Sequence, residues 1–97
     1  MVSPVADIYK ALADRTRRVI LDELAQRDDQ TLFEICSRLA TKHQLASTRQ
    51  AISQHLAVLE EAGLVTARRE GRYKYHTFDP TPLSEIHERW PRERTGG

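Results

Sequence analysis

Residues 47–78 read STRQAISQHLAVLEEAGLVTARREGRYKYHTF and contain the clearest structural signals of the chain. In its first half the apolar residues Ile52, Leu56 and Leu59 recur at the spacing of an α-helix and form one narrow stripe. The sequence therefore predicts a helix over about residues 47–62 that buries a single side.

The ends and the outward face of this helix can also be predicted. Ser47 and Gln50 have the spacing of a capping box, and Gly63 is the type of residue that commonly closes a helix. At about 100° per residue, the side opposite the apolar stripe carries amides, small residues and a carboxylate. These are Gln50, Gln54, Ala57 and Glu61, flanked by Ala51 and Ser53. Such a helix is suited to lie against a flat polar partner.

After this helix the apolar period changes from 3.6 residues to about 2, the period of a β-strand. Residues 64–69 and 73–78 are two runs rich in β-branched and aromatic residues. The short loop between them, residues 70–72, contains Gly71, a residue suited to a positive φ. The sequence predicts a β-hairpin at about residues 65–78. Four cations lie at or beside its tip: Arg68, Arg69, Arg72 and Lys74.

Three helices are predicted before this stretch. Ser3 is the expected cap of the first, with Pro4 in its first turn, and Asp14 is the expected cap of the second. Thr31 and Glu34 form a capping box for the third. The apolar residues of the three helices recur at helical spacing: Val5, Ile8, Tyr9 and Leu12; Ile20, Leu21 and Leu24; Leu32, Ile35, Cys36 and Leu39.

A last helix follows the hairpin and opens at Thr81 and Pro82. Its residues at helical spacing are Leu83, Ile86, His87 and Trp90. Pro91 breaks that pattern, and residues 92–97 are expected to be a disordered tail. The predicted fold class is mainly α with a small β-hairpin (α+β), a winged helix-turn-helix within one domain at residues 1–91.

Length and composition limit the class of protein. The chain has 97 residues, 30% of them charged and 39% hydrophobic, which is the size of one small globular domain. No apolar run approaches the roughly 18 residues of a membrane span, and no secretory signal pattern is present. Cys36 is the single cysteine, which excludes an intramolecular disulfide and fits a reducing compartment. We therefore expect a cytoplasmic protein with no membrane partner.

Motifs of catalysis are missing from the sequence. It contains no glycine-rich phosphate loop, no G-x-S-x-G and no H-E-x-x-H. A chain of this length also encloses little pocket volume. We expect that the protein is not an enzyme and uses no cofactor.

The net charge is only +1, but the positive charge is unevenly distributed. Five cations fall within residues 46–78 against three carboxylates, and four of the five lie within residues 68–74. A local basic stripe on a near-neutral chain indicates a polyanionic partner.

A helix-turn-helix followed by a basic hairpin is typical of a DNA-binding module. The second helix of the motif enters the major groove, where glutamine pairs with adenine. The residues expected to meet the groove are Ser47, Thr48, Arg49, Gln50, Ser53, Gln54 and His55. The residues of the hairpin, or wing, expected to contact phosphates or the minor groove are Arg68, Arg69, Arg72 and Lys74. The expected partner is a double-stranded DNA operator.

Three stretches of the chain resemble the winged-helix repressors of the ArsR family: ALADRTRRVILDEL, STRQAISQHLAVLEEAGLV and REGRYKYHTFDPTPL. The resemblance covers roughly residues 5–90. It implies a prokaryotic, homodimeric, sequence-specific DNA-binding transcriptional regulator, usually a repressor. It also implies a dimer interface formed by the first and last helices. The matching residues are Val5, Ile8, Tyr9, Leu12, Leu83, Ile86 and Trp90.

The chain departs from the family at its metal-sensing positions. Metal-sensing members carry paired cysteines early in the third helix, where this chain has Cys36 alone, or a set on the final helix, where it has only His87 and Glu88. Cys36 falls on an apolar helix face, so we expect a small buried side chain rather than a reactive thiol. The histidines are in different elements: His43, His55, His76 and His87. We therefore expect no metal site.

Two further departures concern the helices. The connection from Leu39 to Ser47 is longer than the usual turn of a helix-turn-helix. Pro91 also shortens the last helix, so we expect the first helix to contribute more of the dimer interface. The basic run Arg15, Arg17 and Arg18 is either solvated surface or a phosphate contact. Three alternatives stay open. The first is a protein-interaction module without DNA binding. The second is a metal- or redox-responsive repressor that uses Cys36 or histidines. The third is a regulator that responds to an unidentified small-molecule effector.

Overall fold

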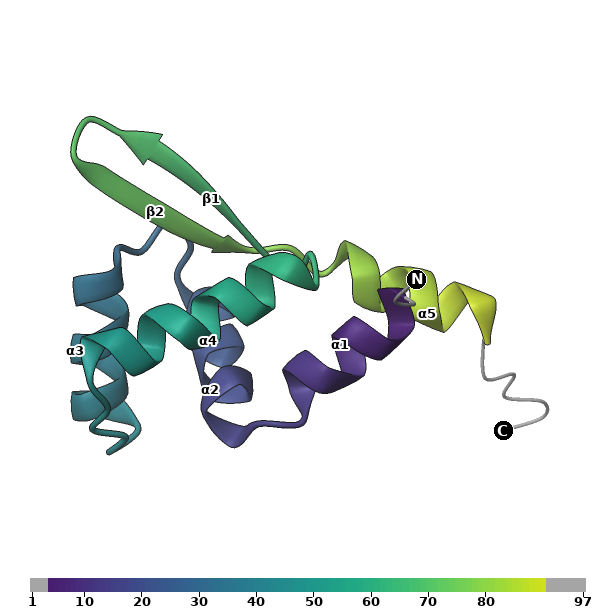
Figure 1. Cartoon of the computed structure of the whole chain (residues 1–97), viewed down its shortest axis with the longest axis horizontal. Helices are drawn as coiled ribbons and strands as arrows, with labels where there is room; N and C mark the ends of the chain where they lie inside the picture. Colours follow the sequence, from purple (N-terminus) through teal and green to yellow (C-terminus); the bar gives the residue numbers. More distant parts are fainter. Residues whose placement is uncertain (1–3, 91–97) are drawn as a thin grey trace.

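The computed structural model describes residues 4–90 as helices and one hairpin, and every predicted element is present (Figure 1). The helices are α1 (Pro4–Leu12), α2 (Arg15–Gln26), α3 (Leu32–Lys42), α4 (Arg49–Glu61) and α5 (Thr81–Arg89). The hairpin, or wing, consists of β1 (Val65–Glu70) and β2 (Tyr73–Phe78). The predicted cap Ser3, the breaker Pro91 and the tail at residues 92–97 lie outside the described residues. None of the described helices has the length and apolar character needed to cross a bilayer.

Side chains cap the helices of the helix-turn-helix, with one correction to the predicted boundaries. The capping box of Thr31 and Glu34 is present, with both reciprocal hydrogen bonds formed. At α4, however, the cap is Thr48 and not Ser47: Thr48 Oγ1 accepts from the Ala51 backbone N–H at 3.0 Å. Because the third helical residue is then Ala51, no side chain completes a capping box.

Gly63 ends α4 and turns the chain into the wing. Its φ of +77° is the left-handed conformation that suits glycine. The Gly63 N–H donates to the carbonyl of Glu60, and the Leu64 N–H donates to that of Leu59, each at 3.0 Å. This paired pattern satisfies the last carbonyls of the helix and delivers Leu64 and Val65 into the core.

The wing is a two-stranded antiparallel hairpin that projects beyond the helices (Figure 1). Its register runs from Val65 opposite Phe78 to Glu70 opposite Tyr73. The loop therefore holds two residues rather than the predicted three, because Glu70 belongs to β1. Gly71 opens this loop with a φ of +61°, as its sequence position predicts.

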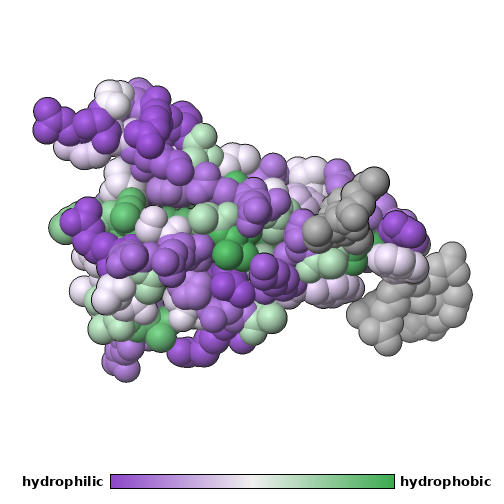
Figure 2. All heavy atoms as spheres, in the orientation of Figure 1, coloured by the Kyte–Doolittle hydropathy of each residue, from purple (hydrophilic) through white to green (hydrophobic). Residues whose placement is uncertain are grey.

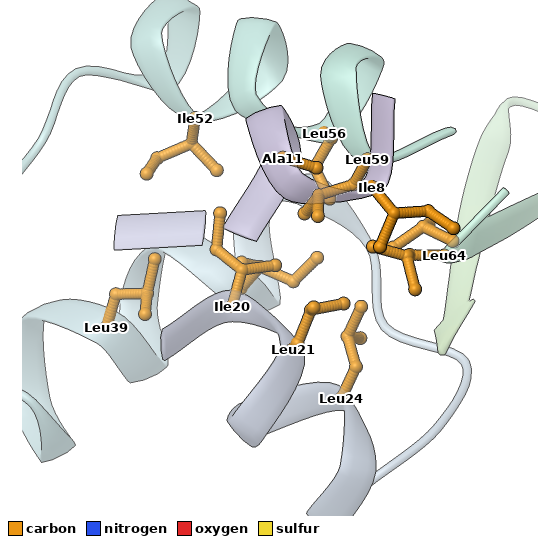
Figure 3. Close-up of a cluster of buried hydrophobic side chains, with 12 residues drawn as sticks. Ile8, Ala11, Ile20, Leu21, Leu24, Leu39, Ile52, Leu56, Leu59 and Leu64 are labelled. Carbon is orange, nitrogen blue, oxygen red and sulfur yellow. The ribbon is translucent and has the colours of Figure 1, made fainter. Parts of the chain in front are cut away.

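The hydrophobic core forms where α2, α3 and α4 meet, and α1 covers it (Figure 3). Its fully buried side chains include Ile20, Leu24, Ile35, Leu39, Ile52, Leu59 and Leu64. Ile8 of α1 is only 4% exposed and belongs to this core. Because the core of a single chain already buries this side chain, little of Ile8 is left for the predicted contact with a second copy.

A buried polar contact joins the α2–α3 connection to the wing. Gln30 and His76 exchange two backbone hydrogen bonds, at 3.1 Å and 2.8 Å. The His76 ring also donates through Nδ1 to the Gln30 carbonyl at 3.0 Å. Both side chains are buried, and nothing in the sequence pattern predicted this bridge. It holds the base of the wing against the helices.

A buried carboxylate of α2, that of Glu23, binds cations and a histidine at the C-terminal end of α3. The Glu23 side chain has no exposed surface, and His43, Lys42 and Arg38 bond it at 3.1, 3.2 and 3.4 Å. Burial alone would raise the pKa of Glu23, but the hydrogen bonds from His43 and Lys42 and the nearby Arg38 hold it below its usual value. The ionised carboxylate thus ties α2 to the end of α3.

Candidate nucleic-acid interface

The outward face of α4 is exposed as the sequence predicts. Gln50, Ser53, Gln54, Ala57 and Glu61 are all exposed on the side opposite the buried stripe. Among residues 4–90, Gln50, Ser53 and Gln54 have no side-chain hydrogen bond to another group. Their amides and hydroxyl are therefore free to bond an external partner.

The start of α4 adds positive charge to this face. Ser47, Thr48 and Arg49 are exposed, and the first backbone N–H groups of a helix attract anions. The Arg49 guanidinium forms no hydrogen bond or ion pair with the described part of the chain. These positions suit contact with phosphate beside the groove.

One arginine connects α1, α2 and α4, and we call this contact the Arg17 brace. Arg17 donates to the carbonyls of Ala11 (2.8 Å) and Lys10 (3.0 Å) at the end of α1. It also lies 3.1 Å from Nδ1 of His55 on α4. A guanidinium only donates, so Nδ1 of His55 is the acceptor and the neutral ring carries its hydrogen on Nε2. His55 is thus held with an N–H available on its other side.

The three arginines at the start of α2 differ in their hydrogen bonds. Arg17 is used for internal bonds, and Arg18 donates to the Leu12 carbonyl at 2.7 Å. Only Arg15 of the three is exposed without a described partner. Arg17 and Arg18 therefore cap the end of α1, Arg15 and Arg18 are exposed at the surface as one of the two alternatives predicts, and a phosphate contact stays a prediction.

The four wing cations are not equivalent. Arg68 pairs with Asp29 (3.4 Å) and Glu70 (3.2 Å) and lies over the Tyr75 ring, and Lys74 pairs with Glu60 of α4 (3.4 Å). Arg69 and Arg72 are exposed and have no ion pair within residues 4–90. Exposed ion pairs contribute little, so phosphate can compete for Arg68 and Lys74, but Arg69 and Arg72 are free from the start.

A cleft of about 430 Å³ separates α4 from the wing. The N-terminal turn of α3 closes it on the third side. Four of the predicted DNA-contacting residues line it: Arg49, Ser53, Arg72 and Lys74. The two predicted surfaces, helix and wing, thus share one concave boundary.

The thiol and the histidines have separate local roles. Cys36 is half-buried beside the core, and burial raises the pKa of its thiol. His43 bonds Glu23, His55 accepts from Arg17 and His76 bonds Gln30, whereas His87 is exposed. Within residues 4–90 no three ligand side chains come together at one point.

The far end of the molecule carries exposed aromatic residues. α5 packs beside α1 at the end opposite α3 (Figure 1). Tyr9 is 60% exposed and Trp90 57% exposed, with the Arg89 guanidinium 4.7 Å from the Trp90 ring. Hydrophilic side chains cover the tip of the wing instead (Figure 2). The α1–α5 end thus exposes two large rings, and the opposite end carries the basic wing together with two further exposed rings, Phe33 and Tyr73.

Comparison with known proteins agrees with this architecture. A family model described as a helix-turn-helix domain matches residues 12–68. The chain is 53% identical to an uncharacterised HTH-type transcriptional regulator, YuzN, of Bacillus subtilis, over 86% of this chain and 90% of that protein. It is 30% identical to the transcriptional repressor SdpR of the same organism, over 81% of this chain and 80% of that protein.

A solved structure of a transcriptional regulator has the same fold. An ArsR-like transcriptional regulator from Rhodococcus sp. RHA1 superposes with a TM-score of 0.67 at 35% identity, covering 89% of this chain and 77% of that one. The match includes the helix-turn-helix and extends over most of the chain. This chain is therefore a DNA-binding transcriptional regulator of winged helix-turn-helix fold and belongs to the ArsR family.

Proposed function

We propose that the protein is a homodimeric repressor that recognises an imperfect palindrome in double-stranded DNA. The observation that carries this proposal is the exposed face of α4, where Gln50, Ser53 and Gln54 have no bonds to other described groups. Amides on such a face read adenine edges in the major groove. Two-fold symmetry sets the half-sites about one helical turn apart, centre to centre.

Recognition and anchoring are divided between α4 and the wing. Gln50 and Gln54 specify bases, and Ser53 assists them. Residues around the start of α4 contact backbone phosphates beside the groove: Ser47, Thr48, Arg49 and His55. Arg69 and Arg72 anchor the wing on phosphate, with Arg68 and Lys74 joining once their carboxylate partners are displaced.

The second copy docks on the α1–α5 end. Tyr9 and Trp90 expose large apolar rings there, and a buried aromatic side chain is a typical interface anchor. The half-buried residues around them complete the surface: Val5, Leu12, Leu83 and Ile86. Ile8 is left out because it lies in the core.

The cellular location follows from the partner. A prokaryotic regulator acts where the genomic DNA lies, which is the cytoplasm. Its occupancy of the operator is then set by its own concentration and by any ligand that competes with DNA.

Sedimentation and gel shifts test the proposal together. The native chain is expected to sediment as a dimer at micromolar concentration. Tyr9→Glu is expected to give a folded monomer with much weaker operator binding, because a charge replaces an interface ring. Ala40→Glu adds the same charge on the exposed side of α3 and serves as the control. A stable native monomer contradicts the dimer, and a dimer that shifts no genomic fragment is instead a protein-interaction module.

A further inference from the structure

The cleft between α4 and the wing has the size and lining of a small-molecule site. Its volume of about 430 Å³ falls within the range of ligand pockets. Leu32, Leu56 and Ala57 give it an apolar lining. A DNA phosphate gains nothing from apolar walls, whereas an organic ring does.

An exposed aromatic ring borders this cleft at the start of α3. This ring is Phe33, which is 68% exposed, whereas the Tyr73 ring lies 6.3 Å from that of Tyr75 on the same strand. A phenylalanine so exposed contributes little to the core, and it is not among the predicted DNA contacts. The Phe33 ring offers a flat surface for stacking against a ligand ring.

The charge around the cleft selects an anion. Arg49 and Arg72 line it without an ion pair within the described residues, whereas Lys74 is already paired with Glu60. An arginine that approaches a carboxylate in such a site can bond it through two parallel N–H groups.

His76 gives the cleft a hydrogen-bond acceptor. Its Nδ1 donates to the Gln30 carbonyl, so in the neutral ring Nε2 is the unprotonated nitrogen. The ring is 4% exposed, lines the cleft, and has no described partner for Nε2. A phosphodiester has no hydrogen to donate to this nitrogen, but a hydroxyl does.

From these four features we infer that the cleft binds a small hydroxy-substituted aromatic acid. The ring stacks on Phe33, the carboxylate meets Arg72 or Arg49, and the hydroxyl donates to His76. The bound acid occupies space between Arg49, Ser53 and Arg72, so it excludes DNA from the same residues and releases the operator. This last step rests on the proposed function, whereas binding of the acid itself does not.

Calorimetry on the full chain tests the binding, with 4-hydroxybenzoate as the probe. We expect a dissociation constant of about 1 mM or tighter. Benzoate, which lacks the hydroxyl, is expected to bind about fivefold more weakly, and phenol, which lacks the carboxylate, at least about tenfold more weakly. Backbone amide shifts in NMR should be confined to the cleft. Inorganic phosphate that binds as tightly, with the same shifts, would overturn the assignment.

Phe33→Ala is the decisive variant because its side chain is exposed and outside the DNA surface. It should weaken 4-hydroxybenzoate at least about fivefold and leave operator affinity unchanged, and Ser37→Ala, on the exposed side of the same helix, should change neither. Phe33→Leu keeps the fold while removing the ring, so it replaces Phe33→Ala if that variant unfolds. No binding of 4-hydroxybenzoate at about 10 mM, or binding unaffected by loss of the ring, overturns the inference.

Measurements of operator binding with and without 4-hydroxybenzoate distinguish a failure of this inference from a failure of the proposed function. In the native chain 4-hydroxybenzoate should raise the apparent dissociation constant for the operator, and in Phe33→Ala it should not. If the chain binds the acid but no DNA, the proposed function fails and the ligand site stands. If it binds the operator but not the acid, only the ligand site fails.

Discussion

Two sets of polar side chains in this protein differ in their hydrogen bonding. On the exposed face of α4, Gln50 and Gln54 have no hydrogen-bond partner among the described residues. Behind the helix-turn-helix, Glu23, Gln30 and Arg17 each bond at least two other groups. Both groups consist of polar side chains, but one is exposed and unbonded whereas the other forms hydrogen bonds within the fold.

The bonded group holds the helices in place, and the unbonded group is held ready for a partner. Removing a bonded side chain leaves buried partners unsatisfied, which lowers the free energy of unfolding. Removing an exposed and unbonded one changes stability little. The comparison therefore predicts that stability and DNA affinity respond to different sets of residues.

The largest expected effect is on operator affinity, from Gln50→Ala or Gln54→Ala. Loss of a bidentate base contact costs about 1–3 kcal/mol, and the dimer carries each change twice, so about 2–6 kcal/mol is expected. Binding to random DNA and the free energy of unfolding should stay nearly unchanged. Fluorescence anisotropy with operator and random duplexes measures the ratio. If both duplexes lose affinity equally, α4 does not read bases.

The next effect is on stability, from Glu23→Gln. The substitution leaves His43, Lys42 and Arg38 without their shared carboxylate, and a loss of about 2 kcal/mol is expected because these partners are partly exposed. Asp22→Asn, on the exposed side of the same helix, should stay within about 0.5 kcal/mol. Urea unfolding measures both. Equal losses in the two variants would show that the buried cluster does not stabilise the fold.

The same carboxylate predicts a pH dependence. The pKa of Glu23 is lower in the folded chain than its usual 4.5, so its contribution is complete above pH 4.5 and is lost as the pH falls through the folded value. The free energy of unfolding should therefore decrease on acidification below pH 4.5. In Glu23→Gln this decrease should be shallower than in Asp22→Asn, as urea titrations at several pH values will measure.

A smaller effect separates the wing cations. Arg72 has no ion pair within residues 4–90, so Arg72→Ala should reduce the slope of log affinity against log salt by about 0.9 per contact, twice per dimer. Arg68→Ala should reduce it less, because Asp29 and Glu70 already compete for that guanidinium. Affinity measured over a salt series checks this. A larger change from Arg68→Ala would mean that its pairs open fully on DNA.

The smallest effect is expected at Cys36. Its thiol is half-buried and its pKa is raised by burial, which makes it a poor thiolate for metal or oxidant. Cys36→Ser should leave operator affinity within about twofold, and chelator or zinc should change it no more than that. Tight stoichiometric zinc in the purified chain, with altered DNA affinity on its removal, would refute this.

The elements were predictable from sequence because their signals are local. The apolar stripe of α4, the capping box at Thr31, and the glycines at positions 63 and 71 each depend on neighbours within a few residues. The exposed face of α4 followed from the same periodicity. The cap of α4 was misplaced by one residue because Ser47 and Thr48 are both good caps and only the final backbone distinguishes them.

What was missed depends on contacts between residues far apart in the chain. The sequence does not reveal that Glu23 meets His43, that Gln30 meets His76, or that Arg17 meets His55. Ile8 shares the apolar stripe of α1 with Tyr9, yet packing buries the first and exposes the second. The division of the wing cations likewise depends on Asp29 and Glu60, which lie outside the hairpin.

The bridge between Gln30 and His76 also orders the events of synthesis. The two residues are 46 positions apart, so the bridge forms only after the ribosome has added most of the chain. By then α1 to α4 have emerged with nearly all the core residues they share. α1 to α4 are therefore synthesised before β2 can close this long loop, and α5, which packs on α1, is synthesised after it.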